Sequence, residues 1–176
     1  MVNERLSVGM ISLGCAKNLV DSEVMLGLLH KQGYRLTVDP SQADIIVINT
    51  CTFIEAATSE SIECILEMAR YKQEGRCRAL ILAGCMGTRY GQQLLDGLPE
   101  VNAVIGSGEV PRIAEVAKRT LSGERFVLVE EPTFIYSDTT PRITATAPHL
   151  AFVKIAEGCN HRCSYCVIPQ VRGAYR

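Results

Sequence analysis

The chain has 176 residues, of which 47% are hydrophobic and 21% charged, the balance of a soluble globular protein with room for one domain and part of a second. Its net charge of -1 and sequence pI of about 6.3 argue against a basic surface for nucleic acid, so we expect no direct nucleic-acid partner. Met1 to Leu13 carries Glu4 and Arg5 and only a short, broken apolar run, which is not typical of a secretory signal. No apolar stretch approaches the roughly 20 residues of a membrane span, and we expect a cytoplasmic protein without membrane contact.

The first 120 residues alternate between apolar runs and segments of helical period. The runs predict strands at Leu6–Leu13, Tyr34–Val38, Asp44–Asn49, Ala79–Ala83 and Val101–Ile105. Between them the pattern predicts helices at Val20–Gln32, Ser59–Tyr71, around Tyr90–Leu95, and from Pro111 to about Thr120. This alternation predicts a doubly wound α/β fold with a mostly parallel, five-stranded sheet in the flavodoxin-like order 2-1-3-4-5.

The composition of the sequence changes after residue 120. Residues 121–150 are punctuated by prolines and threonines and are predicted to be a linker, with one possible strand at Phe126–Val129. Ala151–Ile155 has the pattern of a new strand. We therefore expect an α/β domain at residues 1–120, a linker, and the truncated start of a second domain at residues 151–176.

Eight cysteines in a chain without an export signal favour metal binding over disulfides. Cys15, Cys51 and Cys85, here called the strand-end cysteines, each follow a predicted strand, and in the flavodoxin-like order those three strands are neighbours about 4.8 Å apart. We expect their thiols to face one another across a span suited to one iron–sulfur cluster. Two alternatives are buried residues that merely end strands, and a zinc site. Cys64 and Cys77 do not share this position and are predicted to be packing residues.

The most specific signal is a C-x3-C-x2-C pattern formed by Cys159, Cys163 and Cys166, here called the motif cysteines, which directly follows a predicted strand. Three thiolates can hold a [4Fe–4S] cluster and leave its fourth iron without a protein ligand. Such an open coordination position lets a metal centre bind a substrate or cofactor. The alternatives are chance and a zinc knuckle completed by His161, a residue that we expect to be solvated.

This motif on the first strand-to-helix loop of a second domain resembles the radical S-adenosylmethionine superfamily. The resemblance implies that the free iron chelates the amino and carboxylate groups of the methionine part of S-adenosylmethionine. It also implies that an electron from the cluster splits the sulfonium to give a 5′-deoxyadenosyl radical, with the protein supplying placement. Tyr165 matches the aromatic residue that flanks the adenine in this superfamily.

The combination of strand-end and motif cysteines is similar to the methylthiotransferase family over the whole chain. The resemblance implies two [4Fe–4S] clusters: the strand-end cysteines hold one whose free iron carries the transferred sulfur, and the motif cysteines hold the radical-generating one. It implies no catalytic residue beyond these ligands. Because residues 151–176 hold only the start of a radical domain, we expect this fragment to be inactive alone.

Two stretches, Ser12–Glu23 and Glu157–Cys163, are similar to the branch of the family that adds a methylthio group to the β-carbon of an aspartate in ribosomal protein S-twelve. The tRNA-modifying relatives typically have a Gln-Met-Asn type sequence after the first cysteine, where this chain has Ala16-Lys17-Asn18. The implied partners are the ribosomal protein, an electron donor and a sulfur donor. Two alternatives stay open: a tRNA adenosine methylthiotransferase, and a non-catalytic iron–sulfur or zinc-binding module.

Overall fold

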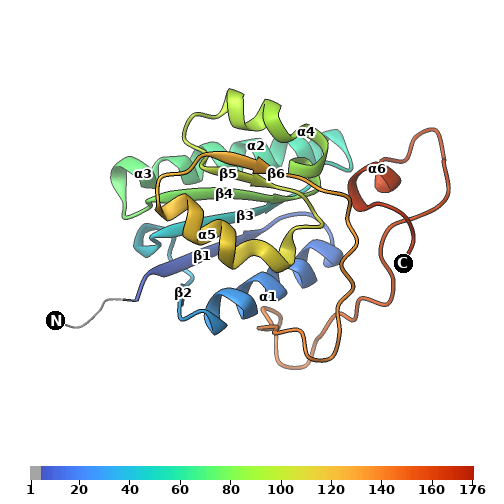
Figure 1. Ribbon diagram of the computed structural model, residues 1–176, viewed down its shortest axis with the longest axis horizontal. Helices are drawn as coiled ribbons and strands as arrows, with labels where there is room; N and C mark the ends of the chain where they lie inside the picture. Colours follow the sequence, from blue (N-terminus) through green and yellow to red (C-terminus); the bar gives the residue numbers. More distant parts are fainter. Residues whose placement is uncertain (1–4) are drawn as a thin grey trace.

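The central sheet of the computed structural model, which describes residues 5–176, has six parallel strands in the order β2-β1-β3-β4-β5-β6 (Figure 1). Met1 to Glu4, the start of the segment predicted not to be a secretory signal, lie outside the described residues. The strands are β1 (Ser7–Ser12), β2 (Arg35–Thr37), β3 (Ile45–Thr50), β4 (Ala79–Gly84), β5 (Ala103–Ile105) and β6 (Phe126–Leu128).

The predicted α/β fold and the flavodoxin-like order of the first five strands are confirmed. The sheet has one strand more than predicted, because Phe126–Leu128 pairs in parallel with β5. This apolar run was predicted only as a possible strand inside the linker. It covers the edge that β5 would otherwise leave unpaired.

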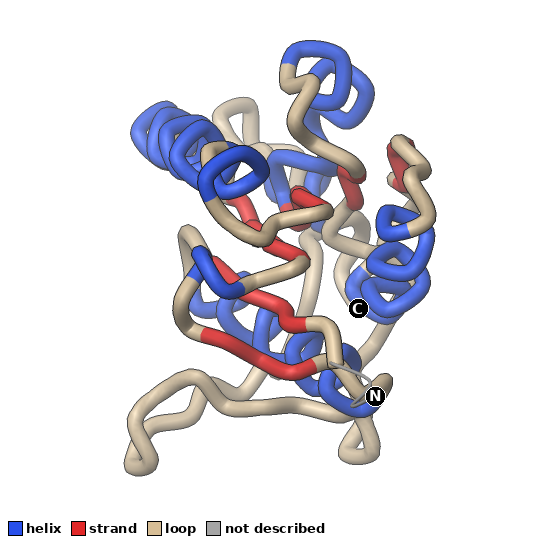
Figure 2. The backbone as a smooth tube through the Cα atoms, turned by 90° about the vertical axis from the view of Figure 1, so that its left-hand side faces the viewer, coloured by secondary structure: helices blue, strands red, loops and turns tan. Residues whose placement is uncertain are grey.

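Helices cover both faces of the sheet (Figures 1 and 2). On one face lie α1 (Ala16–Lys31) and α5 (Ile113–Leu121), and on the other lie α2 (Glu55–Ala69) and α4 (Cys85–Gly97). Short helical segments complete the connections: α3 (Tyr71–Glu74), η1 (Pro40–Gln42) and η2 (Val110–Arg112). In the part of the chain that the structure describes, no helix is long and apolar enough to cross a bilayer.

The core follows directly from the central strand β3. Ile45 and Val47 pack into the layer of α1 and α5, whereas Ile46 and Ile48 pack into the layer of α2 and α4. All four side chains are fully buried. Because both faces are covered, the strand is a continuous apolar run rather than an alternating one.

The prediction of a strand at Ala151–Ile155 is wrong: these residues form no strand in the structure. Val153 and Ile155 are 79% and 92% exposed, since no neighbouring strand among the described residues pairs with this segment. An apolar run needs such a partner to satisfy its backbone groups. After residue 128 the chain instead runs as a loop past α1 and ends in the short helix α6 (Ile168–Arg172), beyond the carboxyl ends of the strands (Figure 1).

Glu23 of α1 holds the loop after β6 in place. This carboxylate is fully buried and accepts hydrogen bonds from the Arg142 guanidinium, at 2.8 Å from Nε, and from the backbone N–H of Ala145, at 2.7 Å. The backbone carbonyl of Glu23 accepts a further bond from the N–H of Ile143. The buried Glu23 therefore docks this part of the loop on α1 through its bonds with Arg142, Ile143 and Ala145.

Candidate metal centre

The three strand-end cysteines line one pocket at the carboxyl edge of the sheet. Cys15 is the N-cap of α1 after β1, Cys51 directly follows β3, and Cys85 is the first residue of α4 after β4. Cys51 and Cys85 are each 7% exposed, whereas Cys15 is exposed. The pocket has a volume of about 580 Å³, within the usual range for a ligand site. Its other walls are mostly apolar: Gly14, Ala16, Lys17, Phe53, Ile54, Ala57, Ile168, Val171 and Arg172.

Two glycines make room for this arrangement. Gly14 has φ +86°, and a Cβ there would lie 2.8 Å from the Cys51 sulfur. Gly84 has φ +93°, and a Cβ there would lie 2.3 Å from Oδ1 of Asn49 and 2.7 Å from the carbonyl of Thr50. Both positions lie in the left-handed region that L side chains rarely adopt. The glycine before Cys15 and the one before Cys85 are thus required by the turn and by the close approach of β3.

Asn18 joins two of the strand ends. Its side chain is fully buried, and Nδ2 donates to the carbonyl of Leu13 at 2.8 Å and to that of Thr50 at 3.0 Å. In return, the amide of Asn49 donates to the backbone carbonyl of Asn18 at 2.8 Å. Leu13 directly follows β1, and Thr50 is the last residue of β3. A single amide on α1 therefore fixes the loops that carry Cys15 and Cys51.

A serine of α2 fixes the backbone of Cys51. The Cys51 N–H donates to Oγ of Ser61 at 3.1 Å, and this hydroxyl lies 3.0 Å from the Cys51 carbonyl. Ser61 is fully buried. The backbone of the middle cysteine is thus held from the opposite face of the sheet to Asn18.

The Cys85 thiol is buried beside a buried arginine. Nε of Arg172 donates to the Cys85 sulfur at 3.2 Å, and Arg172 is 2% exposed. Burial raises the pKa of the Cys85 thiol above its ordinary value, Arg172 acts in the opposite direction, and the charges of Cys51 and Cys15 add to the increase. Three thiols in one pocket disfavour one another's anions, so a positive metal centre or the arginine is needed to stabilise them together.

A group of charged residues surrounds Arg172. Its Nη1 donates to Asp21 at 2.5 Å and to Glu157 at 3.2 Å. Nζ of Lys154 lies 2.7 Å from Asp21 and also contacts Glu157. Burial alone would raise the pKa of Glu157, but Arg172 and Lys154 outweigh it and hold that pKa below its usual range.

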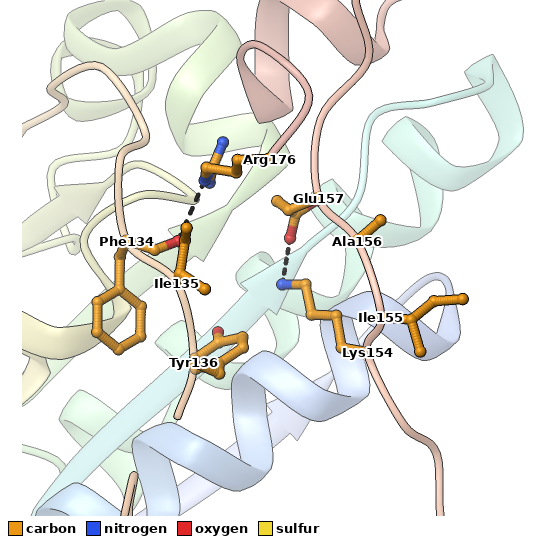
Figure 3. Close-up of a pocket in the computed structure, with 8 residues that line it drawn as sticks. All are labelled: Phe134, Ile135, Tyr136, Lys154, Ile155, Ala156, Glu157 and Arg176. Carbon is orange, nitrogen blue, oxygen red and sulfur yellow. Dashed lines mark hydrogen bonds and ion pairs between the residues drawn. The ribbon is translucent and has the colours of Figure 1, made fainter. Parts of the chain in front are cut away.

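Figure 3 shows the outer side of this charged group. Lys154 points toward Glu157, and its Nζ lies 4.6 Å from the ring centroid of Tyr136. The side chain of Arg176 bonds to the carbonyl of Phe134 across a small pocket of about 100 Å³. Burial, and secondarily Asp21, raises the pKa of Tyr136, whose hydroxyl donates to that carboxylate. The pocket is small and is closed on one side by the ion pairs.

The motif cysteines lie in a loop whose base is closed by backbone bonds. The N–H of Cys159 donates to the carbonyl of Gly173 at 3.1 Å, and that of Cys166 donates to the carbonyl of Cys163 at 3.1 Å. Cys163 is exposed and the other two are half-buried. His161 is exposed and Tyr165 is 87% exposed. Within residues 5–176 no three His, Cys, Asp or Glu side chains form the close group that would hold a single metal ion.

The two sets of cysteines meet through residues that follow the motif. Val167, next to Cys166 in the chain, packs with Val171 against Cys85. Ile168, Val171 and Arg172 line the pocket of the strand-end cysteines. The motif loop therefore ends beside that pocket.

Residues 7–106 match the family described as "Uncharacterized protein family UPF0004". The chain belongs to this family. It is 48% identical over 171 residues to the "Ribosomal protein uS12 methylthiotransferase RimO" of Pelotomaculum thermopropionicum, covering 97% of this chain and 38% of the relative. The proteins of the same name from Pelobacter propionicus and Geobacter sulfurreducens are each 49% identical, over 98% and 100% of this chain and 39% and 40% of theirs.

This UPF0004 chain spans about two fifths of the length of those relatives. The similarity to methylthiotransferases that the sequence indicated is confirmed. Sequence reasoning did not single out four residues that build the site: Asn18, Asp21, Glu157 and Arg172. Asn18 and Asp21, three residues apart on a helix, are polar positions on its buried side, and that is the signal that could have revealed them.

Proposed function

We propose that this protein is a cytoplasmic radical S-adenosylmethionine methylthiotransferase that modifies the β-carbon of an aspartate of ribosomal protein S-twelve. The observation that carries the proposal is the convergence of Cys15, Cys51 and Cys85 on one pocket from three neighbouring strands. The RimO name of relatives about 50% identical to this chain supports the substrate.

The donor set of the pocket fits an iron–sulfur cluster. Thiolates are the usual ligands of such clusters, and no histidine or carboxylate lines the pocket. A cluster shares its ligands among several irons, so its cysteines need not crowd around one atom as zinc ligands do. The strand-end cysteines would hold one [4Fe–4S] cluster and the motif cysteines the other, with Tyr165 beside the adenine of S-adenosylmethionine. When bound, these groups would supply the sulfur transfer and the radical chemistry.

The chain's own residues have distinct roles in this proposal. Gly14 and Gly84 allow the turns before Cys15 and Cys85. Asn18 fixes the separation of the loops that carry Cys15 and Cys51. Phe53 and Ile54, each more than half exposed, form an apolar rim on the pocket that excludes water from one side. The exposed Cys15 lies at the open side, where a sulfur donor or substrate can approach.

The number of irons per chain tests the cluster assignment. We expect roughly eight irons and eight sulfides in the complete protein after anaerobic reconstitution, falling to about four in a Cys15→Ala, Cys51→Ala, Cys85→Ala variant. Cys64→Ala with Cys77→Ala is the matched control, because Cys64 and Cys77 lie outside the pocket and should leave iron unchanged. Iron that is unaffected by the three strand-end substitutions would show that they are core residues. Zinc in place of iron would favour the non-catalytic module.

The substrate is tested with the complete protein, an electron donor and S-adenosylmethionine. We expect ribosomal protein S-twelve to gain a methylthio group on one aspartate, and tRNA to stay unmodified, as read by mass spectrometry. Methylthioadenosine in tRNA with an unmodified ribosomal protein would instead establish the tRNA-modifying alternative. Residues 151–176 are proposed as the start of the radical domain, so the 176-residue chain alone should show no turnover.

A further inference from the structure

The buried Arg172 belongs to neither set of cysteines, yet it touches the pocket of one and follows the motif of the other. It is 2% exposed, and the two valines beside it, Val167 and Val171, pack on Cys85. A fully buried guanidinium is costly unless its N–H groups are paired. The hydrogen-bond partners of the Arg172 guanidinium therefore indicate its role.

Each edge of the guanidinium has a partner. Nη1 donates to the carboxylates of Asp21 and Glu157, and Nη2 contacts Oδ1 of Asn18. These three partners determine the plane of the group. The remaining edge, Nε–H, points at the sulfur of Cys85 at 3.2 Å. Because a guanidinium is planar and rigid, its anchoring on two carboxylates aims the fourth donor at the thiol.

The same contacts connect the two cysteine-bearing parts of the chain. Asn18 and Asp21 lie on α1, just after Cys15, whereas Glu157 directly precedes the motif loop and Arg172 ends α6 behind it. Lys154 bridges the two carboxylates as well, and Lys17 lies 3.7 Å from Glu157. Arg172 is the charged member of this group that donates to a strand-end cysteine, and the Cys85 thiol in turn donates weakly to Oδ1 of Asn18 at 3.9 Å.

We infer that Arg172 is a positioning residue that ties the motif loop to the strand-end pocket and donates a hydrogen bond to the Cys85 sulfur, so that it raises the reduction potential of the cluster held there. The inference rests on the proposed function in assigning Cys85 to a cluster. A hydrogen bond and a positive charge at a ligating sulfur favour the more negative, reduced state. The arginine therefore makes this cluster easier to reduce than the three thiolates alone would.

The potential is measured in the complete protein with the motif cysteines changed to alanine, so that only one cluster is present. We expect Arg172→Gln to shift the midpoint potential to a more negative value, with the electron paramagnetic resonance spectrum of the reduced cluster as the readout. Arg172→Lys keeps the charge but not the planar guanidinium, so its midpoint potential should lie between those of Arg172→Gln and the protein with Arg172 intact. Arg176→Gln is the matched control: Arg176 is in the same segment, and its guanidinium bonds to the backbone carbonyls of Phe134, Arg172 and Ala174.

An unchanged potential in Arg172→Gln, with iron retained, would overturn the inference. If Arg172→Gln fails to hold iron, the potential of Arg172→Lys is used instead, and an unchanged value there would overturn the inference. Absence of iron while Arg172 is intact would instead be a failure of the proposed function. The two failures are therefore distinguishable.

A second measurement needs no metal. In the metal-free complete protein, we expect Arg172→Gln and Arg172→Lys to speed alkylation of Cys85 relative to the exposed Cys15, because the cover over Cys85 is loosened. The rates are compared at high pH, where loss of the arginine no longer limits the amount of Cys85 thiolate. Arg176→Gln should leave the ratio of the two rates unchanged. Equal ratios in wild type and both Arg172 variants would show that Arg172 does not tie this segment to the pocket, and would overturn the inference whatever the iron content.

Discussion

The Cβ position of Gly14 lies 2.6 Å from the Cβ of Cys51 and 2.8 Å from its sulfur, although the two residues are 37 positions apart in the chain. The first strand-end loop therefore passes against the second cysteine without space for one methyl group. The pocket can hold its three thiols only because the residue before Cys15 has no side chain.

Replacing that glycine should therefore disturb metal binding more than folding. Gly14→Ala adds backbone strain of about 1–2 kcal/mol and displaces Cys51. Gly33→Ala is the matched control, because Gly33 has φ +91° but nothing within 4 Å of its Cβ position. We expect both variants to lose unfolding free energy, measured in urea, with the larger loss in Gly14→Ala because of its clash with Cys51, and Gly14→Ala alone to lose about four irons per chain. Equal iron in the two variants would contradict the assignment of Cys51.

Removing the amide of Asn18 should destabilise the metal-free protein. Asn18→Ala leaves the carbonyls of Leu13 and Thr50 buried without a donor, and each such group costs about 1–3 kcal/mol. We expect a loss of about 3 kcal/mol in the free energy of unfolding. Gln93→Ala, at an exposed position, should change it by less than about 0.5 kcal/mol. A loss no larger than that of the control would contradict the bridging role.

The stability contributed by Asp44 should depend on pH. Burial by itself would raise the pKa of Asp44, but the N–H and hydroxyl of Ser7 and the charge of Arg76 outweigh it and lower the pKa. Because the folded pKa lies below the unfolded value of about 3.9, the stabilisation is full above that value and is lost as the pH falls through the folded pKa. Asp44→Asn should thus cost about 1–2 kcal/mol at pH 7.

The difference between wild type and Asp44→Asn should then shrink as the pH is lowered below about 4, as followed by urea unfolding at several pH values. Asp138→Asn removes an exposed carboxylate from the loop after β6 and serves as the control, with no such difference at any pH. A difference in unfolding free energy that stays constant from pH 7 to pH 3 would show that Asp44→Asn acts by disturbing packing and not by removing the charge of Asp44.

The buried Glu23 should control the docking of the loop that follows β6. Glu23→Gln removes the charge that Arg142 pairs with, and breaking a buried pair costs about 3 kcal/mol. We expect tryptic cleavage after Arg142 to become faster by on the order of 10-fold to 100-fold, read by mass spectrometry. Arg119→Gln removes exposed ion pairs with Glu115 and Glu124 and should leave the cleavage rate unchanged.

Much of the fold follows from local sequence pattern. Apolar runs such as Ile45–Ile48 contain no polar residue, so they predict strands buried on both faces, and the α/β alternation then leaves few possible strand orders. Ala151–Ile155 is apolar apart from Lys154, yet it forms no strand. A strand depends on a neighbour with which to exchange backbone hydrogen bonds, and local sequence does not record whether one is present.

By itself, the sequence determined that Cys15, Cys51 and Cys85 would emerge at the same edge of the sheet, because each follows a strand and parallel strands end together. Only the tertiary structure decided what surrounds them. Arg172 lies 87 residues from Cys85 in the chain, and Asp21 lies 151 residues from Arg172, so no local spacing relates these residues. A buried charge is stable only where distant segments bring all of its partners together, and that is a property of the folded chain.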